Sequence, residues 1–158
     1  MDTLTVAFFG HRYIENFFVT EDRLQEVISE LLRNNQYVEF LVGRNGDFDQ
    51  MVSSTVLRCK RNIRDDNSSL VLVLPYATSE FENNEDSFYN YYDEIEICEE
   101  SASTHFKNAI QTRNRSMVDR ADLVVCYIER QEGGAFQTVQ YAKKQNKRII
   151  NLAEIAEE

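Results

Sequence analysis

Glycine-rich turns that carry arginine follow the apolar runs of this chain, and this combination suits the binding of a small anion. Gly10-His11-Arg12 directly follows the first apolar run, and Gly43-Arg44-Asn45-Gly46 directly follows the second. Gly133-Gly134 comes shortly after a third run, at residues 123–127. A glycine lets the backbone turn tightly or approach a ligand closely, and arginine pairs strongly with phosphate and carboxylate groups. We therefore expect these turns to recognise a phosphate or a carboxylate.

Two of these turns lead directly into predicted helices, whose first N–H groups are free to bind an anion. In Gly46-Asp47-Phe48-Asp49 the carboxylates leave two interpretations open, because one can cap the helix or accept the hydroxyls of a ribose. Glu132-Gly133-Gly134-Ala135 is the second possible anion site, with a simple turn as the alternative. We expect Gly46 and Gly134 to have a positive φ or to lie against the ligand. Neither spacing matches a dinucleotide fingerprint or a P-loop.

Arg113-Asn114-Arg115 adds two further cations on a predicted helix. Arg113 and Arg115 lie roughly 200° apart around a helix, so only one of them can face a small ligand. His11 can act as an acid or base near neutral pH, and the alternative is a structural hydrogen bond. The chain has two histidines and no Cys/His cluster, so we expect no metal site and no metal cofactor.

The elements that position these residues are predicted from hydrophobic periodicity and capping signals. The predicted strands are 4–9, 37–42, 70–74, 94–97, 123–128 and 148–152. The first predicted helix covers 20–34, with Thr20 as its N-cap, and the second begins at Asp47 or Asp49 and ends in the basic cluster at 58–64. Two further helices are predicted at 104–120 and 136–144. Residues 76–92 have no such periodicity and are expected to form a loop or lid. Alternating strands and helices predict an α/β, Rossmann-like three-layer sandwich with a mainly parallel sheet of five to six strands, as a single domain over 1–158.

Charge and composition narrow the classes of partner. The 158 residues carry a net charge of −10, which argues against a nucleic-acid polymer because phosphate backbones require a basic face. Residues 76–104 contain nine carboxylates and no Lys or Arg. No apolar run is long enough for a membrane span and the start does not resemble a signal peptide, so we expect no membrane partner and a cytoplasmic location. Three distant cysteines indicate free thiols.

The same residues resemble the YpsA-like branch of the SLOG superfamily. The resemblance is carried by Phe9-Gly10-His11-Arg12, by 43–49, by 113–124 and by Gly133-Gly134-Ala135. It implies a Rossmann-like fold, found in bacterial-type or phage-type proteins, whose glycine-rich loops bind nucleotides, nucleotide sugars or related derivatives. Some relatives sense such molecules as signals in stress or antiviral systems, and relatives often self-associate into homo-oligomers.

The chain is also similar to the lysine-decarboxylase-like phosphoribohydrolases, whose RxxxM element is matched by Arg113 and Met117. Their PGGxGTxxE loop is matched only in part, because Val139-Gln140 stands where the catalytic glutamates would lie. Cleavage of an N-glycosidic bond needs a carboxylate at the oxocarbenium-like centre. In this chain Glu132, Asp49 or another acidic residue would have to supply that carboxylate in place of the missing glutamates. The resemblance therefore implies binding without this hydrolysis.

We predict that the chain binds or senses a nucleotide-derived anionic small molecule at the carboxyl edge of the sheet, without a cofactor. One alternative is a nucleotide N-glycosidase or phosphoribohydrolase, and another is a protein-interaction module that uses the acidic, aromatic segment 76–92. The predicted binding residues are Gly10, His11, Arg12, Gly43, Arg44, Asn45, Gly46, Phe48, Asp49, Arg113, Asn114, Arg115, Glu132, Gly133, Gly134 and Ala135.

Overall fold

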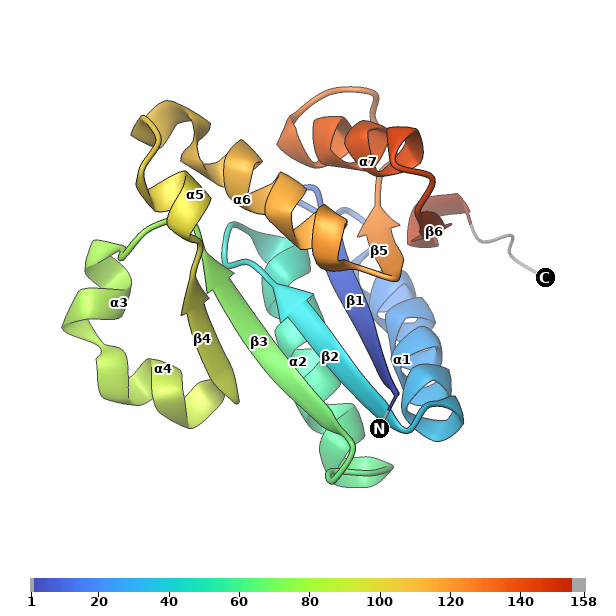
Figure 1. The fold of residues 1–158 in the computed structure, drawn as a ribbon. Coiled ribbons are helices and arrows are strands. Elements are labelled where there is room, and N and C mark those ends of the chain that lie inside the picture. The colour runs from blue at the N-terminus through green and yellow to red at the C-terminus, as the bar shows by residue number, and fades with distance from the viewer. Residues whose placement is uncertain (1, 155–158) are drawn as a thin grey trace.

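Parallel strands form one sheet in the order β4-β3-β2-β1-β5-β6 in the computed structural model, which describes residues 2–154 (Figure 1). The strands are β1 (Thr3–Gly10), β2 (Tyr37–Val42), β3 (Ser68–Leu74), β4 (Glu94–Ile97), β5 (Leu123–Tyr127) and β6 (Arg148–Asn151). The continuous apolar runs of β3 and β5 are buried along their whole length because helices cover both faces of the sheet. The predicted α/β, Rossmann-like fold is confirmed.

Helices cover the two faces of the sheet and give three layers (Figure 1). The helices are α1 (Phe17–Asn34), α2 (Asp47–Asn62), α3 (Ser79–Asn83), α4 (Glu85–Tyr91), α5 (Glu99–Ala102), α6 (Phe106–Arg120), α7 (Gly134–Lys144) and the 3-10 turn η1 (Leu152–Glu154). Helices α1 and α2 pack with one face of the sheet in a core that includes Phe8 and Val52. Helices α6 and α7 pack with the other face around Ala7 and Met117. Within residues 2–154 no helix is long and apolar enough to cross a membrane.

The order of the strands creates a crevice beside β1. From β1 the chain moves outward through β2 and β3 to β4, and it then returns to place β5 on the other side of β1. The connection after β1 runs along the α1 face, whereas the connection after β5 runs along the α7 face (Figure 1). The loops at the carboxyl ends of β1 and β5 therefore diverge, which is the arrangement that leaves a ligand-binding crevice in open α/β sheets.

The structure corrects three predicted elements. Helix α1 begins at Phe17, and Thr20 is buried in its first turn rather than capping it. The loop or lid expected at 76–92 contains α3 and α4 instead. These helices have five and seven residues, too few to show a repeating apolar face, and Phe81 and Phe88 anchor them to the core. The helix predicted from 104 begins at Phe106, after the separate short helix α5. Residues 1 and 155–158 of the predicted domain lie outside the described residues.

We expect Gly10→Ala to lower the free energy of unfolding by about 1–3 kcal/mol, the usual cost of overpacking a core. A methyl group at Gly10 would collide with the ring of Phe48, which is fully buried beneath it. Gly134→Ala is the control, because a methyl group there would meet only the amide end of the flexible Gln111 side chain. Urea unfolding of both variants measures the difference, and equal stability would contradict the packing account.

Candidate functional site

A cavity of about 500 Å³ lies in the crevice, and we call it the switch-point cleft. Its walls come from the loop 10–13 after β1, from the β2–α2 loop, from α6 and from residues 130–135 before and at the start of α7. Phe8, Ile110 and Met117 contribute apolar surface. An apolar cavity with a few convergent polar groups is the usual form of a small-molecule site. The cleft therefore has the position and size expected of a ligand site in this fold.

Arg113 is the charged centre of the cleft. Only 2% of it is exposed. Its Nη1 donates a hydrogen bond to the carbonyl oxygen of Val73 at 2.8 Å, and its Nε donates to Oδ1 of Asn114 at 2.9 Å. Burial lowers the pKa of Arg113, while the charge of Asp49 opposes that shift. An arginine remains protonated even so, and the cleft therefore holds a fixed positive charge.

Asp49, in the first turn of α2, is the carboxylate whose charge acts on Arg113. Its Oδ2 accepts the N–H of Asn45 at 2.8 Å, so this carboxylate closes the loop that precedes α2. The prediction that Asp47 or Asp49 caps the helix is wrong, because Gly46 is the N-cap and within residues 2–154 no side chain makes a capping hydrogen bond there. Burial raises the pKa of Asp49, and the Asn45 hydrogen bond and the charges of Arg113 and Arg12 oppose that rise. The N–H of Asn45 is thus used by the protein itself. A methyl group at Gly43 would lie 3.0 Å from Arg113 Nη1 and 3.1 Å from Asp49 Oδ2, so these side chains occupy that space.

The residues at the beginning of α7, Gly133, Gly134 and Ala135, line the cleft. Gly133 is the N-cap and has φ +94°, and among the described residues no side chain makes a capping hydrogen bond to the helix. The first N–H groups of a helix have no partner within the helix, so those of residues 134–136 are available to an anion. Thr138 Oγ1 donates to the carbonyl oxygen of Gly134 at 2.9 Å and accepts from Asn114 Nδ2 at 3.1 Å. This network connects the α7 terminus to Arg113.

Arg12 is exposed at the mouth of the cleft, and within residues 2–154 its side chain has no ion pair. Its backbone carbonyl oxygen accepts the N–H of Asp47 at 2.8 Å. A methyl group at Gly46 would lie 2.6 Å from Arg12 Cα, which explains the glycine there. Gly46 itself is extended, with φ 168°. Neither Gly46 nor Gly134 therefore has a positive φ, and Gly133 has that conformation instead. The alternative for Gly46 and Gly134, a position against the ligand, stays a prediction.

His11 has a structural role. It is buried, and its Nε2 accepts the N–H groups of Glu129 at 3.1 Å and Arg130 at 3.3 Å. Burial lowers the pKa of His11, and the charge of Arg130 acts in the same direction. A neutral imidazole that accepts at Nε2 carries its proton on Nδ1. His11 therefore holds the loop after β5 against β1 through structural hydrogen bonds.

Four predicted binding residues do not line the cleft, and one of them is Gly46, which packs against Arg12. Arg44 pairs with Glu80 at 2.9 Å and donates to the hydroxyl of Tyr92 at 2.9 Å, and it lines a different cavity. Phe48 is buried, and its ring packs against Gly10 in the core. Arg115 is exposed, with its guanidinium 5.6 Å from the ring centroid of Tyr141. The helical geometry that separates Arg115 from Arg113 was predicted, whereas the position of Arg44 was not.

Several residues that line the cleft were missed by the sequence analysis. They are Phe8, Phe9, Tyr13, Ile110, Gln111, Met117 and Arg130. Ile110, Arg113, Asn114 and Met117 are spaced i, i+3, i+4 and i+7, so a helical face centred on Arg113 was the signal that would have found two of them. Arg130 follows β5 in the same way that Arg12 follows β1.

Similar folds occur among solved structures, although no family model and no curated protein matches this chain. DNA processing protein A from Streptococcus pneumoniae gives a TM-score of 0.67 at 14% identity over 93% of this chain. The same protein from Helicobacter pylori, described for its unique single-stranded DNA binding mode, gives 0.64 at 16% identity over 92%. The protein TM1055 gives 0.56 at 16% identity, covering 92% of this chain and 72% of its own. The likeness supports a Rossmann-like fold.

These neighbours correct one prediction. Our exclusion of nucleic-acid polymers as partners is wrong, because a protein with this fold is described as binding single-stranded DNA. The net charge of −10 sums over the whole chain, whereas binding depends on the local field, and Arg12, Arg113 and Arg130 all line the cleft. This chain spans 49% of the length of the S. pneumoniae protein and 63% of the H. pylori protein.

The protonation of His11 predicts how stability depends on pH. Its folded-state pKa lies below the ordinary value of 6.5, so the unfolded chain binds the proton first as the pH falls. The contribution of His11 is therefore complete above about pH 6.5 and decreases below it, by at most about 1.4 kcal/mol per pH unit. We expect His11→Gln, whose amide oxygen accepts hydrogen bonds without titrating, to lack this decrease. His105→Gln, on the exposed histidine, is the control, and urea unfolding between about pH 7 and about pH 5.5 measures both. Equal slopes in the wild type and His11→Gln would contradict this role.

Proposed function

We propose that the switch-point cleft binds a nucleotide-derived anionic molecule, with its phosphate at the N-terminus of α7. The observation that carries this proposal is that the buried cation Arg113 and the uncapped start of α7 line the same cavity. Backbone N–H groups at a helix N-terminus bind phosphate, and a nearby arginine adds charge-assisted hydrogen bonds. Arg12 stands at the mouth without an ion pair in the described part of the chain, so its guanidinium is available to a second phosphate oxygen.

The remaining surface of the cleft suits a nucleoside. Tyr13 is 75% exposed and lines the mouth, where a base can stack on its ring. Ile110 and Met117 offer apolar contact deeper in the cavity. Asp49 uses one oxygen to accept the Asn45 N–H, which leaves its other oxygen for a ribose hydroxyl.

The same site suits a free nucleotide, a nucleotide sugar or one nucleotide unit of a single strand, because all three present a phosphate beside a base. The DNA binding described for the H. pylori neighbour supports including the single strand among them. We infer further that the chain belongs to the SLOG superfamily and its YpsA-like branch, as the glycine-loop motifs suggest. We also propose that residues 1–158 are one domain of a cytoplasmic, ligand-sensing protein that self-associates.

We expect Arg12→Ala to weaken binding of a phosphate-bearing ligand by about 1.5–3 kcal/mol, the range for hydrogen bonds to charged groups. Arg115→Ala is the matched control, since it removes an exposed arginine of α6 that does not line the cleft. Calorimetry with nucleoside mono-, di- and triphosphates, a nucleotide sugar and a single-stranded oligonucleotide measures both variants. The site assignment is wrong if the wild type binds none of them or if both variants lose affinity equally.

The enzyme alternative predicts release of a free base from a nucleoside monophosphate, and we expect none. Val139 is buried, and neither it nor Gln140 lines the cleft, so neither position brings a carboxylate into it. Loss of one electrostatic partner of this kind costs about a hundred- to a thousandfold in rate. Chromatography of the reaction mixture tests this expectation. Steady turnover that disappears in Glu132→Gln and persists in Glu129→Gln would establish the hydrolase instead.

A further inference from the structure

A second cavity, of about 690 Å³, lies between α2, the start of α1 and the α3–α4 pair. Its aromatic walls include Phe17, Phe88 and Tyr91, and its carboxylates are Asp47 and Glu80. Phe17 is 38% exposed and Tyr91 is 40% exposed, so both rings present surface to an incoming group. We call this cavity the aromatic pocket. It is separate from the switch-point cleft, since the two share no lining residue.

Arg44 lines the aromatic pocket, and its side chain is already hydrogen-bonded within the protein. Arg44 donates from Nε and Nη2 to the two oxygens of Glu80, at 2.9 and 3.4 Å, and from Nη1 to the hydroxyl of Tyr92 at 2.9 Å. Its guanidinium also lies 4.8 Å from the ring centroid of Phe88. Hydrogen bonds on all three nitrogens leave Arg44 poorly able to receive an anion. With Arg44 and Glu80 neutralising each other, Asp47 gives the pocket a net negative charge.

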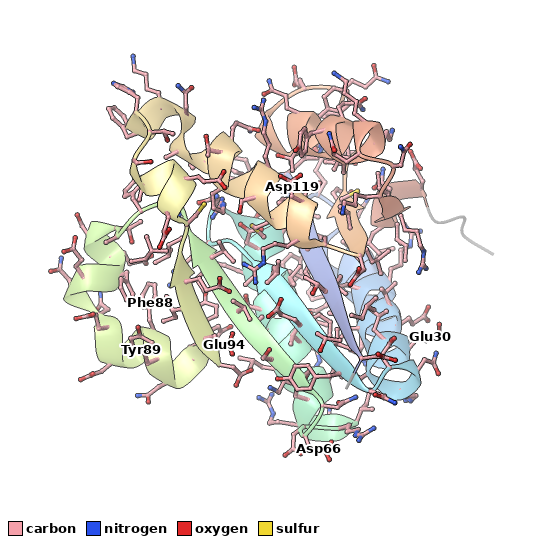
Figure 2. The ribbon with its side chains drawn as sticks, viewed as in Figure 1. Glu30, Asp66, Phe88, Tyr89, Glu94 and Asp119 are labelled. Atoms are coloured by element: carbon pink, nitrogen blue, oxygen red, sulfur yellow. The ribbon has the colours of Figure 1, made fainter. Side chains whose placement is uncertain are left out.

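The short helices α3 and α4, which contribute residues to the pocket, carry charge of the same sign. Residues 76–104 contain nine carboxylates and no Lys or Arg. On α3 and α4, Glu82, Glu85 and Asp86 are exposed and have no ion pair within residues 2–154. Figure 2 shows Phe88 and Tyr89 on α4 at the β4 side of the sheet, far from Glu30 on α1. A negative, aromatic surface attracts a cation that carries an apolar stem, which describes the side chains of arginine and lysine.

We propose that the aromatic pocket docks a basic peptide segment of a partner protein, with an Arg or Lys side chain between Phe17 and Tyr91 and its charge toward Asp47. The pocket is larger than one side chain needs, and the unpaired carboxylates of α3 and α4 continue beyond it. A small amine would leave those carboxylates unused, whereas an extended segment with several cations would contact both. Long-range attraction between opposite charges also speeds the encounter of such partners.

The probe that tests this proposal is a labelled peptide of repeated Arg-Ser-Gly-Leu units, compared with a peptide in which Glu replaces Arg. Binding is measured by fluorescence polarisation, and we expect the Arg peptide to bind and the Glu peptide not to bind. The double variant Phe17→Ala/Tyr91→Ala is expected to weaken binding about tenfold, because both rings contact the cation. Asp47→Asn is expected to weaken it about threefold or more. Phe106→Ala, a 67% exposed ring outside the pocket, and Glu30→Gln are the matched controls and should bind as the wild type does.

Several outcomes would overturn the proposal. They are no binding of the Arg peptide, equal losses in the pocket variants and the controls, and free arginine or a polyamine binding as tightly as the peptide. A single-stranded oligonucleotide whose binding depends on Phe17 and Tyr91 would assign the pocket to a different class of ligand. Arg12→Ala, which belongs to the switch-point cleft, should leave peptide binding unchanged, so the two sites are tested independently.

Discussion

The burial of the Arg113 charge is the constraint on which the rest of the site depends. A buried cation is costly unless hydrogen bonds and an opposite charge compensate for it. Here the compensation comes from four different parts of the chain: the carbonyl oxygen of Val73 on β3, Asn114 on α6, Thr138 on α7 through Asn114, and the charge of Asp49 on α2. The guanidinium therefore fixes the relative positions of β3, α6, α7 and the β2–α2 loop around one cavity.

The glycines follow from the same crowding. Gly43 leaves room for Arg113 and Asp49, Gly10 leaves room for the Phe48 ring, and Gly46 lies against the backbone of Arg12. A side chain at any of these positions would displace a group that shapes the cleft. Gly133 differs, because nothing lies within 4 Å of a methyl group there and its φ of +94° is what requires glycine. The glycine-containing turns that were predicted to bind ligand therefore also allow close packing between neighbouring elements.

The sheet could be predicted from the sequence because its buried strands are continuous apolar runs, and the crevice followed from the turns after them. The α3 and α4 helices could not, since each is anchored by a single aromatic residue and tertiary packing decides their conformation. The position of Arg44 could not be predicted for a related reason. Its partners Glu80 and Tyr92 are distant in sequence and come close only once those helices fold. Local spacing, by contrast, was enough to separate Arg113 from Arg115.

The central claim is that a phosphate binds between the start of α7 and Arg113. Backbone and arginine side-chain NMR shifts, followed while a nucleoside monophosphate is added, test it most directly. We predict the largest changes at the amides of Gly134 and Ala135 and at Nε of Arg113, with small changes at Arg44 and Arg115. Shift changes centred on the aromatic pocket between α2 and α4 would contradict this account of the cleft. So would the absence of any shift change in the protein when phosphate-bearing ligands are added.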